Sequence, residues 1–443
     1  MKIQLSEHFT YKKLLRFVFP SIVMMIFTSI YGVVDGLFVS NYVGKTAFAA
    51  VNLIMPFIMM LGALGFMIGT GGSAIVAKTL GEGKKEAANQ YFSMLVFVTV
   101  IGGLILSLSG FLFVRPIAGA LGAEGEMLEN CVLYGRITFV SLTAFMLQNV
   151  FQSFFVAAEK PQLGLGVSLA AGVTNMVLDF LFVGIFRWGI AGAAIATAAS
   201  EIVGGLFPIF YFIRKNNSLL RLVKTRIRAG IIGKACTNGS SELMTNLSMS
   251  LVNMLYNVQL MRMAGENGVA AYGVIMYVNF IFISAYLGYS LGSAPLVGYH
   301  YGAQNHAELK NLFKKSLRLV GIWGMVLIVT ALAFAGPLSR IFVGYDKELW
   351  ELTCHGFRLY ALSYLVSGVN IFGSAFFTAL NNGLISAVIS FLRTLVFQLG
   401  VVLVLPVFLG IEGIWLAIAV AEVLALLVTV TFFVKKRKIY HYF

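Results

Sequence analysis

The chain has 443 residues, of which 59% are hydrophobic and only 11% are charged, with a mean hydropathy of +0.88 and a formal net charge of +14. Soluble globular proteins are about 45–50% apolar and about 25% charged, so the composition excludes that class and indicates a polytopic membrane protein. The three cysteines are scattered and form no C-x-x-C pair, so they indicate neither a disulfide framework nor a zinc site.

Twelve apolar segments are long enough to cross a membrane, for which a helix needs about 20 residues. The polar start of the chain leads into a first segment that is too long for the apolar core of a signal peptide. We therefore predict an all-α transmembrane fold. In chain order, the predicted spans are residues 17–40, 48–76, 91–114, 132–156, 163–184, 189–213, 235–261, 269–297, 317–339, 352–379, 385–408 and 412–434.

The basic residues orient these spans. If the N-terminus is cytoplasmic, 23 of the 32 Lys and Arg residues fall on the cytoplasmic side, which matches the usual excess there. Both termini are then cytoplasmic, and the short loops favour a prokaryotic plasma (inner) membrane. This bias also accounts for the net charge without a nucleic-acid partner. The basic tail "KKRK" at residues 435–438 is typical of an anchor to lipid headgroups.

The chain repeats itself at an offset of 221 residues. "GIAGAAIATAASE" from Gly189 aligns with "GIEGIWLAIAVAE" from Gly410, and Asn149 and Ser153 align with Asn370 and Ser374. Six spans are an even number, so the two halves point the same way and are expected to be related by a pseudo-twofold axis along the membrane normal. This pattern suits a transporter with two rocking lobes, although architecture alone leaves a channel or a membrane enzyme open.

The predicted organisation has four parts. Residues 1–213 form an N-lobe with spans 1–6, and residues 235–434 form a C-lobe with spans 7–12. Residues 214–234 form a basic cytoplasmic linker, and residues 435–443 form a basic cytoplasmic tail.

Four oxygen-bearing side chains lie at similar depth in the N-terminal half: Asp35, Asn175, Asp179 and Thr197. Asn175 and Asp179 share one helix face because they are four residues apart. If the three helices are neighbours, the four side chains form a pocket that suits a hard cation such as Na⁺. Two close carboxylates also raise the pKa of one of them, so the pocket equally suits H⁺. The alternative is that both acids are structural and satisfied inside the bundle, but acids within spans typically mark ion pathways.

The other polar and sulfur-containing positions predict less. Glu201 and Glu422 are equivalent in the repeat, which favours a shared structural role. Glu242 is a candidate substrate contact, and Met249 and Met254 are candidates because methionine repacks around varied flat, apolar cations. The sequence contains no complete phosphate-binding loop for ATP, so no cofactor is expected and transport would be driven by an ion.

Several short motifs make the whole chain similar to the multidrug and toxic compound extrusion (MATE) transporters, in particular the bacterial MepA-like branch. They are "FPS" at residues 19–21, Asp35 fifteen residues after Pro20, "GSA" followed by "LGEGKKEAA", and "NMVLD" paired with "GIAGAAIAT". The resemblance implies antiport, in which a cationic amphipathic drug leaves as Na⁺ or H⁺ enters.

The resemblance also assigns roles to particular residues. It implies that Asp35, Asn175, Asp179 and Thr197 bind the coupling ion and that Pro20 is a candidate hinge, although a proline near a span end is often a helix-start residue. Some members carry a second cation site with an acid on the tenth span. Residues 352–379 contain no acid here, which puts such a site in doubt.

Two other classes of function stay open. A flippase for a lipid-linked precursor or another metabolite, from the same superfamily, is expected to need a cavity rich in Arg and Lys. Only Arg136, Arg358 and Arg393 lie within spans. A channel would conduct ions without a substrate. The expected partners of a transporter are cationic amphipathic small molecules and membrane lipids, and the expected state is a monomer.

Overall fold

The computed structural model describes residues 3–344 and 346–443, and in this part of the chain every regular element is a helix. Three short π-helical segments, η1 to η3, interrupt the α-helices. In chain order, the elements are α1 Tyr11–Phe38, η1 Val39–Val43, α2 Lys45–Gly81, α3 Lys85–Ala120, α4 Gly125–Ala157, α5 Pro161–Asp179, η2 Phe180–Ile185, α6 Gly189–Ile213, α7 Ala229–Gly302, α8 His306–Val343, α9 Lys347–Ala361, α10 Tyr364–Ala379, α11 Gly383–Phe391, η3 Leu392–Phe397, α12 Gln398–Leu409 and α13 Ile411–Tyr440.

The predicted all-α transmembrane fold is confirmed. Ten helical stretches of the described chain are apolar and long enough to span a membrane, and α9 and α10, bent by 49° between them, form an eleventh. Helix α7 has 74 residues and would be about 110 Å long at about 1.5 Å per residue, far more than one crossing needs. Gly265, at φ 59°, breaks its helical path, so α7 makes two crossings and the total is twelve.

The helices extend beyond most of the predicted spans. The segment predicted at 17–40 begins at Tyr11, where the Thr10 side chain accepts a hydrogen bond from the Lys13 amide and caps the helix. The span predicted at 352–379 is two helices that meet at residues 362–363. Hydropathy detects only the part of a helix that lies in lipid, whereas caps and loop contacts determine where the helix ends.

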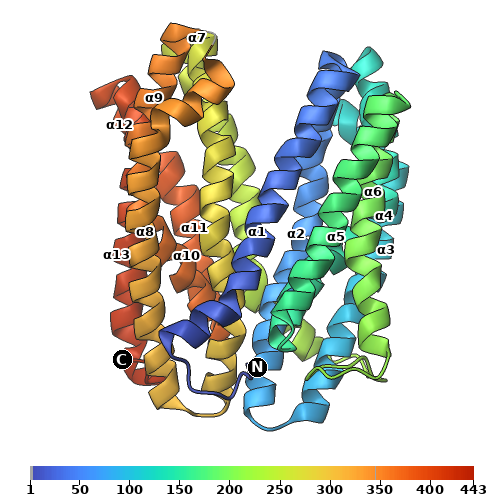
Figure 1. Ribbon diagram of the computed structural model, residues 1–443, viewed down its shortest axis with the longest axis vertical. Coiled ribbons are helices and arrows are strands. Elements are labelled where there is room, and N and C mark those ends of the chain that lie inside the picture. The colour runs from blue at the N-terminus through green and yellow to red at the C-terminus, as the bar shows by residue number, and fades with distance from the viewer. Residues whose placement is uncertain (1–2, 345) are drawn as a thin grey trace.

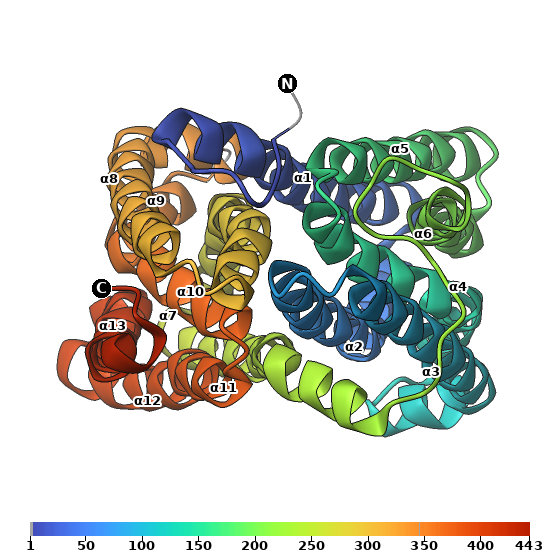
Figure 2. The ribbon, with the colours of Figure 1, turned by 90° about the horizontal axis from the view of Figure 1, so that it is seen from below.

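The helices form two bundles. Viewed from below, α1–α6 gather on one side and α8–α13 on the other, and α7 belongs with the second bundle while its first half reaches across to α2 (Figure 2). Both termini lie at one end of the molecule. The bundles lie close together near that end and diverge towards the opposite end (Figure 1). We call the bundles the N-lobe (α1–α6) and the C-lobe (α7–α13).

The backbone repeats along with the sequence. The hairpin between the first two crossings turns at Gly44 in the N-lobe and at Gly265 in the C-lobe, and both glycines have positive φ. Gly189 and Gly410, at φ 60° and 59°, open the sixth crossing of each lobe in the same way. Both pairs are separated by the same 221 residues as the sequence repeat. Because only glycine adopts this conformation freely, the turns that set the topology are encoded twice.

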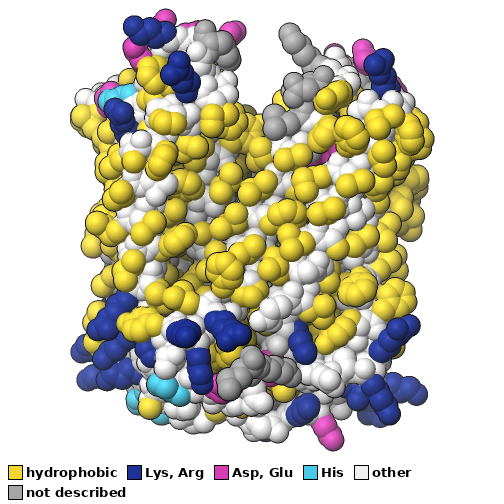
Figure 3. Space-filling model, in the orientation of Figure 1, with side chains coloured by type: hydrophobic (Ala, Val, Ile, Leu, Met, Phe, Trp, Pro, Cys, Tyr) yellow, Lys and Arg dark blue, Asp and Glu magenta, His cyan; other side chains and the backbone are white. Residues whose placement is uncertain are grey.

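The outer surface has the character of a membrane protein. Hydrophobic side chains cover the middle of the molecule, and Lys and Arg gather mainly at the end that carries the termini (Figure 3). Large apolar side chains such as Val407 and Phe408, each 78% exposed, face outward. Such a surface is stable only where lipid covers it. The protein is therefore a multi-pass membrane protein.

Backbone contacts close the end of the molecule that carries the termini. A Cβ built on Gly81 of α2 would lie 2.0 Å from the Tyr299 carbonyl oxygen of α7, and one on Gly302 would lie 2.0 Å from the Lys78 carbonyl oxygen. Deeper in, Gly239 approaches the Met67 carbonyl in the same manner. Any larger residue at these positions would collide with backbone, so the glycines let the two lobes approach each other closely.

The N-terminal segment, residues 3–9, forms a strap across the same end. The Leu5 amide donates to the Glu159 carboxylate of the N-lobe at 2.7 Å, and the Phe9 amide donates to the Glu308 carboxylate of α8 in the C-lobe at 2.9 Å. The Phe9 carbonyl accepts from Lys315 at 2.6 Å. Leu5 and Phe9 are fully buried. The strap therefore links the two lobes.

Replacing Glu308 with Ala is expected to destabilise the protein by about 1–3 kcal/mol, because it leaves the buried Phe9 amide without its acceptor. The expected readout is a lower midpoint of thermal unfolding in detergent. Glu7→Gln is the matched control. It removes only an exposed ion pair with Lys13, and such pairs contribute about 0–1 kcal/mol. Equal midpoints for the two variants would contradict the role of the strap.

Candidate functional site: an acidic cluster and a central cavity

Helices α1, α5 and α6 bring the four predicted oxygen-bearing side chains together. The Asp35 carboxylate of α1 lies next to Asp179 and Asn175 of α5 and to Thr197 of α6. Asp179 is 0% exposed and Asn175 is 2% exposed. Helix α5 packs directly on both α1 and α6, which is why residues more than 140 positions apart meet. We call these four residues the acidic cluster.

The acidic cluster has more acceptors than the surrounding protein can satisfy. Five of its oxygens are buried without a hydrogen-bond partner in the described residues: Asp35 Oδ1, Asn175 Oδ1, both Asp179 oxygens and Thr197 Oγ1. Burying a carboxylate without a donor or counter-charge is costly. A shared proton or a hard monovalent cation would relieve this cost.

The donor set also indicates what the acidic cluster does not suit. Among the described residues there is no group of three His, Cys, Asp or Glu side chains that could hold a metal ion. Two carboxylates with an amide and a hydroxyl do not resemble the nitrogen- and sulfur-rich sets of zinc sites. They are oxygen ligands of the kind that hard cations prefer.

Local helix geometry sets the outer edge of the acidic cluster. Asp179 is the last residue of α5, and the π-helical segment η2 begins directly after it. Asp35 lies one turn before η1, and its carbonyl accepts the amide of Val39, the first residue of η1. Single π-helical turns are frequent at functional sites. Nothing in the residue pattern predicted these segments.

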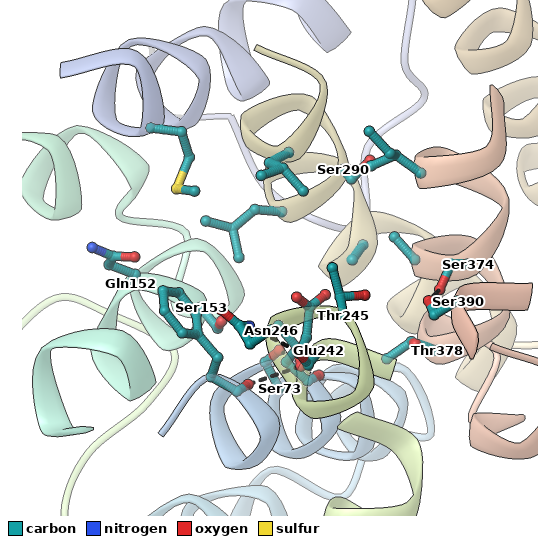
Figure 4. A pocket seen from close by; sticks show the side chains of 18 of the residues that line it. Ser73, Gln152, Ser153, Glu242, Thr245, Asn246, Ser290, Ser374, Thr378 and Ser390 are labelled. Atoms are coloured by element: carbon teal, nitrogen blue, oxygen red, sulfur yellow. Dashed lines mark hydrogen bonds between the residues drawn. The ribbon is translucent and has the colours of Figure 1, made fainter. Parts of the chain in front are cut away.

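A second site, the central cavity, lies between the lobes. Its volume is about 190 Å³, and α1, α2 and α4 of the N-lobe and α7, α10, α11 and η3 of the C-lobe contribute to its lining. In Figure 4, Gln152 and Ser153 border it on one side, Ser374, Thr378 and Ser390 on the other, and Glu242 lies between them. Most of the exposed surface of its walls is apolar, although 12 of the 20 lining residues are polar or charged. Apolar walls with polar groups among them are the usual character of a small-molecule site.

The structure places two of the three candidate substrate contacts in this lining. Glu242 and Met249 line the central cavity, two helical turns apart on one face of α7. Met254, five residues further on, is not among the lining residues, and its side chain is 67% exposed. Five residues correspond to about 140° of rotation on an α-helix, so Met254 faces away from the wall that Met249 forms.

The candidate hinge Pro20 lies inside α1 and not at its start. It is the tenth residue of the helix, is buried, and interrupts the backbone hydrogen bonding of α1 on the way to the acidic cluster. Met25, one turn and a half further along, lines the central cavity. One helix therefore carries the proline, a cavity residue and Asp35 in succession.

The equivalent acids Glu201 and Glu422 are both buried but have different partners. Glu201 accepts a hydrogen bond from Ser141. Glu422 forms an ion pair with Arg393, 2.8 Å from Nη2 to Oε1, and accepts from Asn370 Nδ2 at 2.7 Å. The expectation of one shared structural role therefore holds for their burial and not for their partners. Sequence reasoning noted Arg393 only as a charge within a span, although that charge was the available clue to its position beside the central cavity.

Comparisons with known proteins agree with this architecture. The family model described as MatE matches the chain twice, at residues 20–181 and 243–404, once in each half. "Multidrug export protein MepA" from Staphylococcus haemolyticus is 23% identical over 418 residues, covering 94% of this chain and 92% of that protein. The protein of the same name from Staphylococcus saprophyticus is 24% identical with the same coverage.

Solved structures show the same fold. A MATE protein in complex with MaL6 superposes with a TM-score of 0.93 at 22% identity, covering 98% of both chains. The outward-facing conformation of a multidrug resistance MATE family transporter superposes with a TM-score of 0.92 at 22% identity, covering 98% of this chain and 97% of that one. With the family model matched over most of its length, this twelve-span, two-lobed chain belongs to the MATE family of transporters.

Proposed function

We propose that the protein is a secondary active multidrug antiporter that exports cationic amphipathic compounds in exchange for Na⁺ or H⁺. The observation that carries the proposal is the set of five unpartnered buried oxygens in the acidic cluster, together with a separate cavity between the lobes. A structural carboxylate is normally satisfied by its neighbours. A pair left unsatisfied in the resting protein is suited to binding a mobile cation.

The central cavity suits a cationic, amphipathic substrate. Its apolar wall includes Met25, Phe66 and Met249, and Glu242 supplies an acidic group that can pair with a cation. Methionine side chains repack around differently shaped ligands, which favours a broad range of compounds. The names of the Staphylococcus relatives as multidrug export proteins support the same substrate class.

Coupling would run through α1. Met25 in the central cavity and Asp35 in the acidic cluster lie ten residues apart on this helix, which is about 15 Å. An ion that binds one packing of α1 against α5 more tightly than another shifts the lobes towards that packing. Pro20 gives α1 a point at which it bends, so ion entry at Asp35 would alter the cavity wall and favour substrate release.

The proposed orientation places both termini in the cytoplasm of a prokaryotic cell. The positive end of the molecule then faces inward, as the usual charge bias requires. The cleft between the lobes, visible at the upper end of Figure 3, opens outward. The conformation described here is therefore outward-open and closed at the cytoplasmic end.

The functional units of this proposal are the N-lobe, predicted at residues 1–213, which binds the ion, and the C-lobe, predicted at residues 235–434. In the structure α7 begins at Ala229 and α13 runs to Tyr440, so the C-lobe helices extend into both predicted basic segments. The basic segments 214–234 and 435–443 lie at the cytoplasmic surface and contact lipid headgroups. We expect a monomer to be the transporting unit.

Efflux of ethidium from vesicles tests the proposal, with Na⁺ and pH gradients imposed separately. We expect either or both gradients to drive ethidium export in vesicles that contain the protein. Vesicles without the protein supply the baseline. Ethidium export at a rate that depends on neither gradient would contradict antiport. An ion current in the absence of any substrate would indicate a channel.

A further inference from the structure

The C-lobe wall of the central cavity contains a basic side chain that has no counterpart in the N-lobe. Arg393 lies in η3, and the repeat-equivalent position is Gly172. Arg393 is the only Lys or Arg among the described residues that line the central cavity. Its presence is therefore a specific feature of one wall and not a product of the internal repeat.

The Glu422 carboxylate holds one edge of the Arg393 guanidinium in place. Arg393 Nε donates to Glu422 Oε1 at 2.9 Å and to Oε2 at 3.0 Å, and its Nη2 lies 2.8 Å from Oε1. Asn370 Nδ2 donates to the same carboxylate at 2.7 Å, and Asn370 Oδ1 accepts from Thr429 at 3.0 Å. Glu422 is thus fixed by α10 and α13, and it fixes one edge of the guanidinium.

The other edge of the guanidinium remains available. Arg393 Nη1 donates to no described residue, and the side chain is 13% exposed, whereas that of Glu422 is 2% exposed. A guanidinium with a free N–H edge is the side chain best suited to hold a carboxylate in a defined orientation.

Polar groups next to Arg393 complete a subsite. Ser390 lies one turn before it, and Ser374 bridges the Ser390 and Ser386 hydroxyls at 2.9 and 2.8 Å. Ser374 and Ser390 lie together at one side of the cavity (Figure 4). Ser290 Oγ, in another part of the lining, is buried without a partner. The polar lining thus keeps unused hydrogen-bonding capacity for a ligand or for water.

Glu242 supplies an acidic side chain to the same cavity. Glu242 of α7 and Arg393 of η3 both line it. No side-chain hydrogen bond joins them among the described residues. The cavity therefore presents an acidic and a basic side chain to a ligand that lies between them.

We propose that Arg393 is a specificity-determining residue that binds the carboxylate of zwitterionic amphipathic substrates, while their cationic group is held at Glu242. This inference rests on the proposed export function and assigns to Arg393 the discrimination between ligands with and without a carboxylate in the same cavity. One guanidinium, already paired with Glu422, suits a single carboxylate and not a pyrophosphate, which attracts several basic side chains. The subsite therefore also argues against a lipid-linked pyrophosphate as cargo.

Rhodamine B and its ethyl ester form a suitable pair of probes. Both carry the same flat, delocalised cation, and only rhodamine B has a free carboxylate. Binding of each dye to the purified full-length protein is measured by fluorescence, and export of each is measured in proteoliposomes. The quantity compared between variants is the ratio of rhodamine B affinity to ester affinity.

In the Arg393→Met/Glu422→Gln double variant, the affinity ratio is expected to fall by roughly tenfold, the size of one charge-assisted hydrogen bond. The double substitution removes both buried charges together and so avoids an unpaired Glu422. Glu422→Gln alone is expected to raise the ratio, because Arg393 then keeps its full charge for the ligand. A purely structural role for the pair would not give opposite changes.

Arg358→Met is the matched control, because Arg358 is a basic residue within a span, exposed and outside the cavity. Its ratio should equal that of the wild type. An unchanged ratio in Glu422→Gln and in the double variant would overturn the role of Arg393 even if the ester is exported. Failure of the wild type to export either dye would instead contradict the proposed export function.

Discussion

Replacing Asp35 or Asp179 with Asn is expected to remove the dependence of efflux on the ion gradient. Each substitution keeps the shape of the side chain and removes one of the two carboxylates of the acidic cluster, where both Asp179 oxygens lack partners. The gradient-driven rate of dye export in inverted vesicles should fall by about 5–150-fold, the range of a typical coupling free energy. Passive binding of the dye in the central cavity should persist, since neither acid lines that cavity.

The same variants are expected to unfold at higher temperature than the wild type in ion-free buffer at alkaline pH, where both carboxylates are ionised. Two buried carboxylates that are both charged repel each other and destabilise the folded protein, and removing one relieves the repulsion. A functional acid often costs stability in this way. If both acids were structural, their replacement would lower the unfolding temperature instead. Full ion-coupled efflux by Asp35→Asn would show that the acidic cluster is not the coupling site.

Glu129→Gln is the control for both measurements. Its carboxylate is 62% exposed and pairs only with Arg115 at the surface, so efflux and unfolding temperature should both remain close to those of the wild type.

Replacing Gly302 with Ala is the second change with a large expected effect. The new methyl group would lie 2.0 Å from the Lys78 carbonyl oxygen, so the two lobes must separate at the end that carries the termini. Overpacking of this kind costs about 1–3 kcal/mol. That cost applies only to the conformation in which the lobes touch here. We therefore expect a shift of the population towards states that are open at this end, with slower transport.

Distances between one spin label on each lobe, placed at the end that carries the termini, measure this shift. Gly302→Ala and Gly81→Ala should both lengthen the distance between the labels. Gly233→Ala is the matched control, because Gly233 is also in α7 and has no neighbour within 4 Å of its Cβ position. Identical distance distributions in all three variants would show that the glycine contacts do not hold this end closed.

The acidic cluster could be predicted from the sequence because the depth of each residue in the membrane depends only on its own helix. That depth follows from the helical rise and from where the helix ends. Asp35, Asn175 and Asp179 needed only a correct estimate of where α1 and α5 end. The resemblance to known transporters added that the helices are neighbours. The internal repeat was visible because the same turns recur, as at Gly189 and Gly410.

The central cavity could not be predicted because it depends on how the two lobes pack. Whether Met249 or Met254 faces the cavity is determined by the rotation of α7, which hydropathy does not report. The position of Arg393 depends on η3, a change of helix type with no sequence pattern of its own. The strap formed by residues 3–9 could not be predicted because short polar segments lack periodicity. Its role depends on hydrogen bonds to Glu159 and Glu308, which are distant in the sequence.

The paired approaches of Gly81 to Tyr299 and of Gly302 to Lys78 bear on the origin of the molecule. These glycines are separated by 221 residues, as are Lys78 and Tyr299, the residues whose carbonyls they approach. In a dimer of two identical six-helix chains, the glycine of each chain would approach the carbonyl three residues earlier in the other chain, and this reciprocal contact is the geometry of a twofold symmetric dimer. In such a dimer, any substitution at this position would change both chains, and therefore both halves of the contact, at once. Fusion into a single chain removes that restriction, so Arg393 could arise in one half while Gly172 remained in the other.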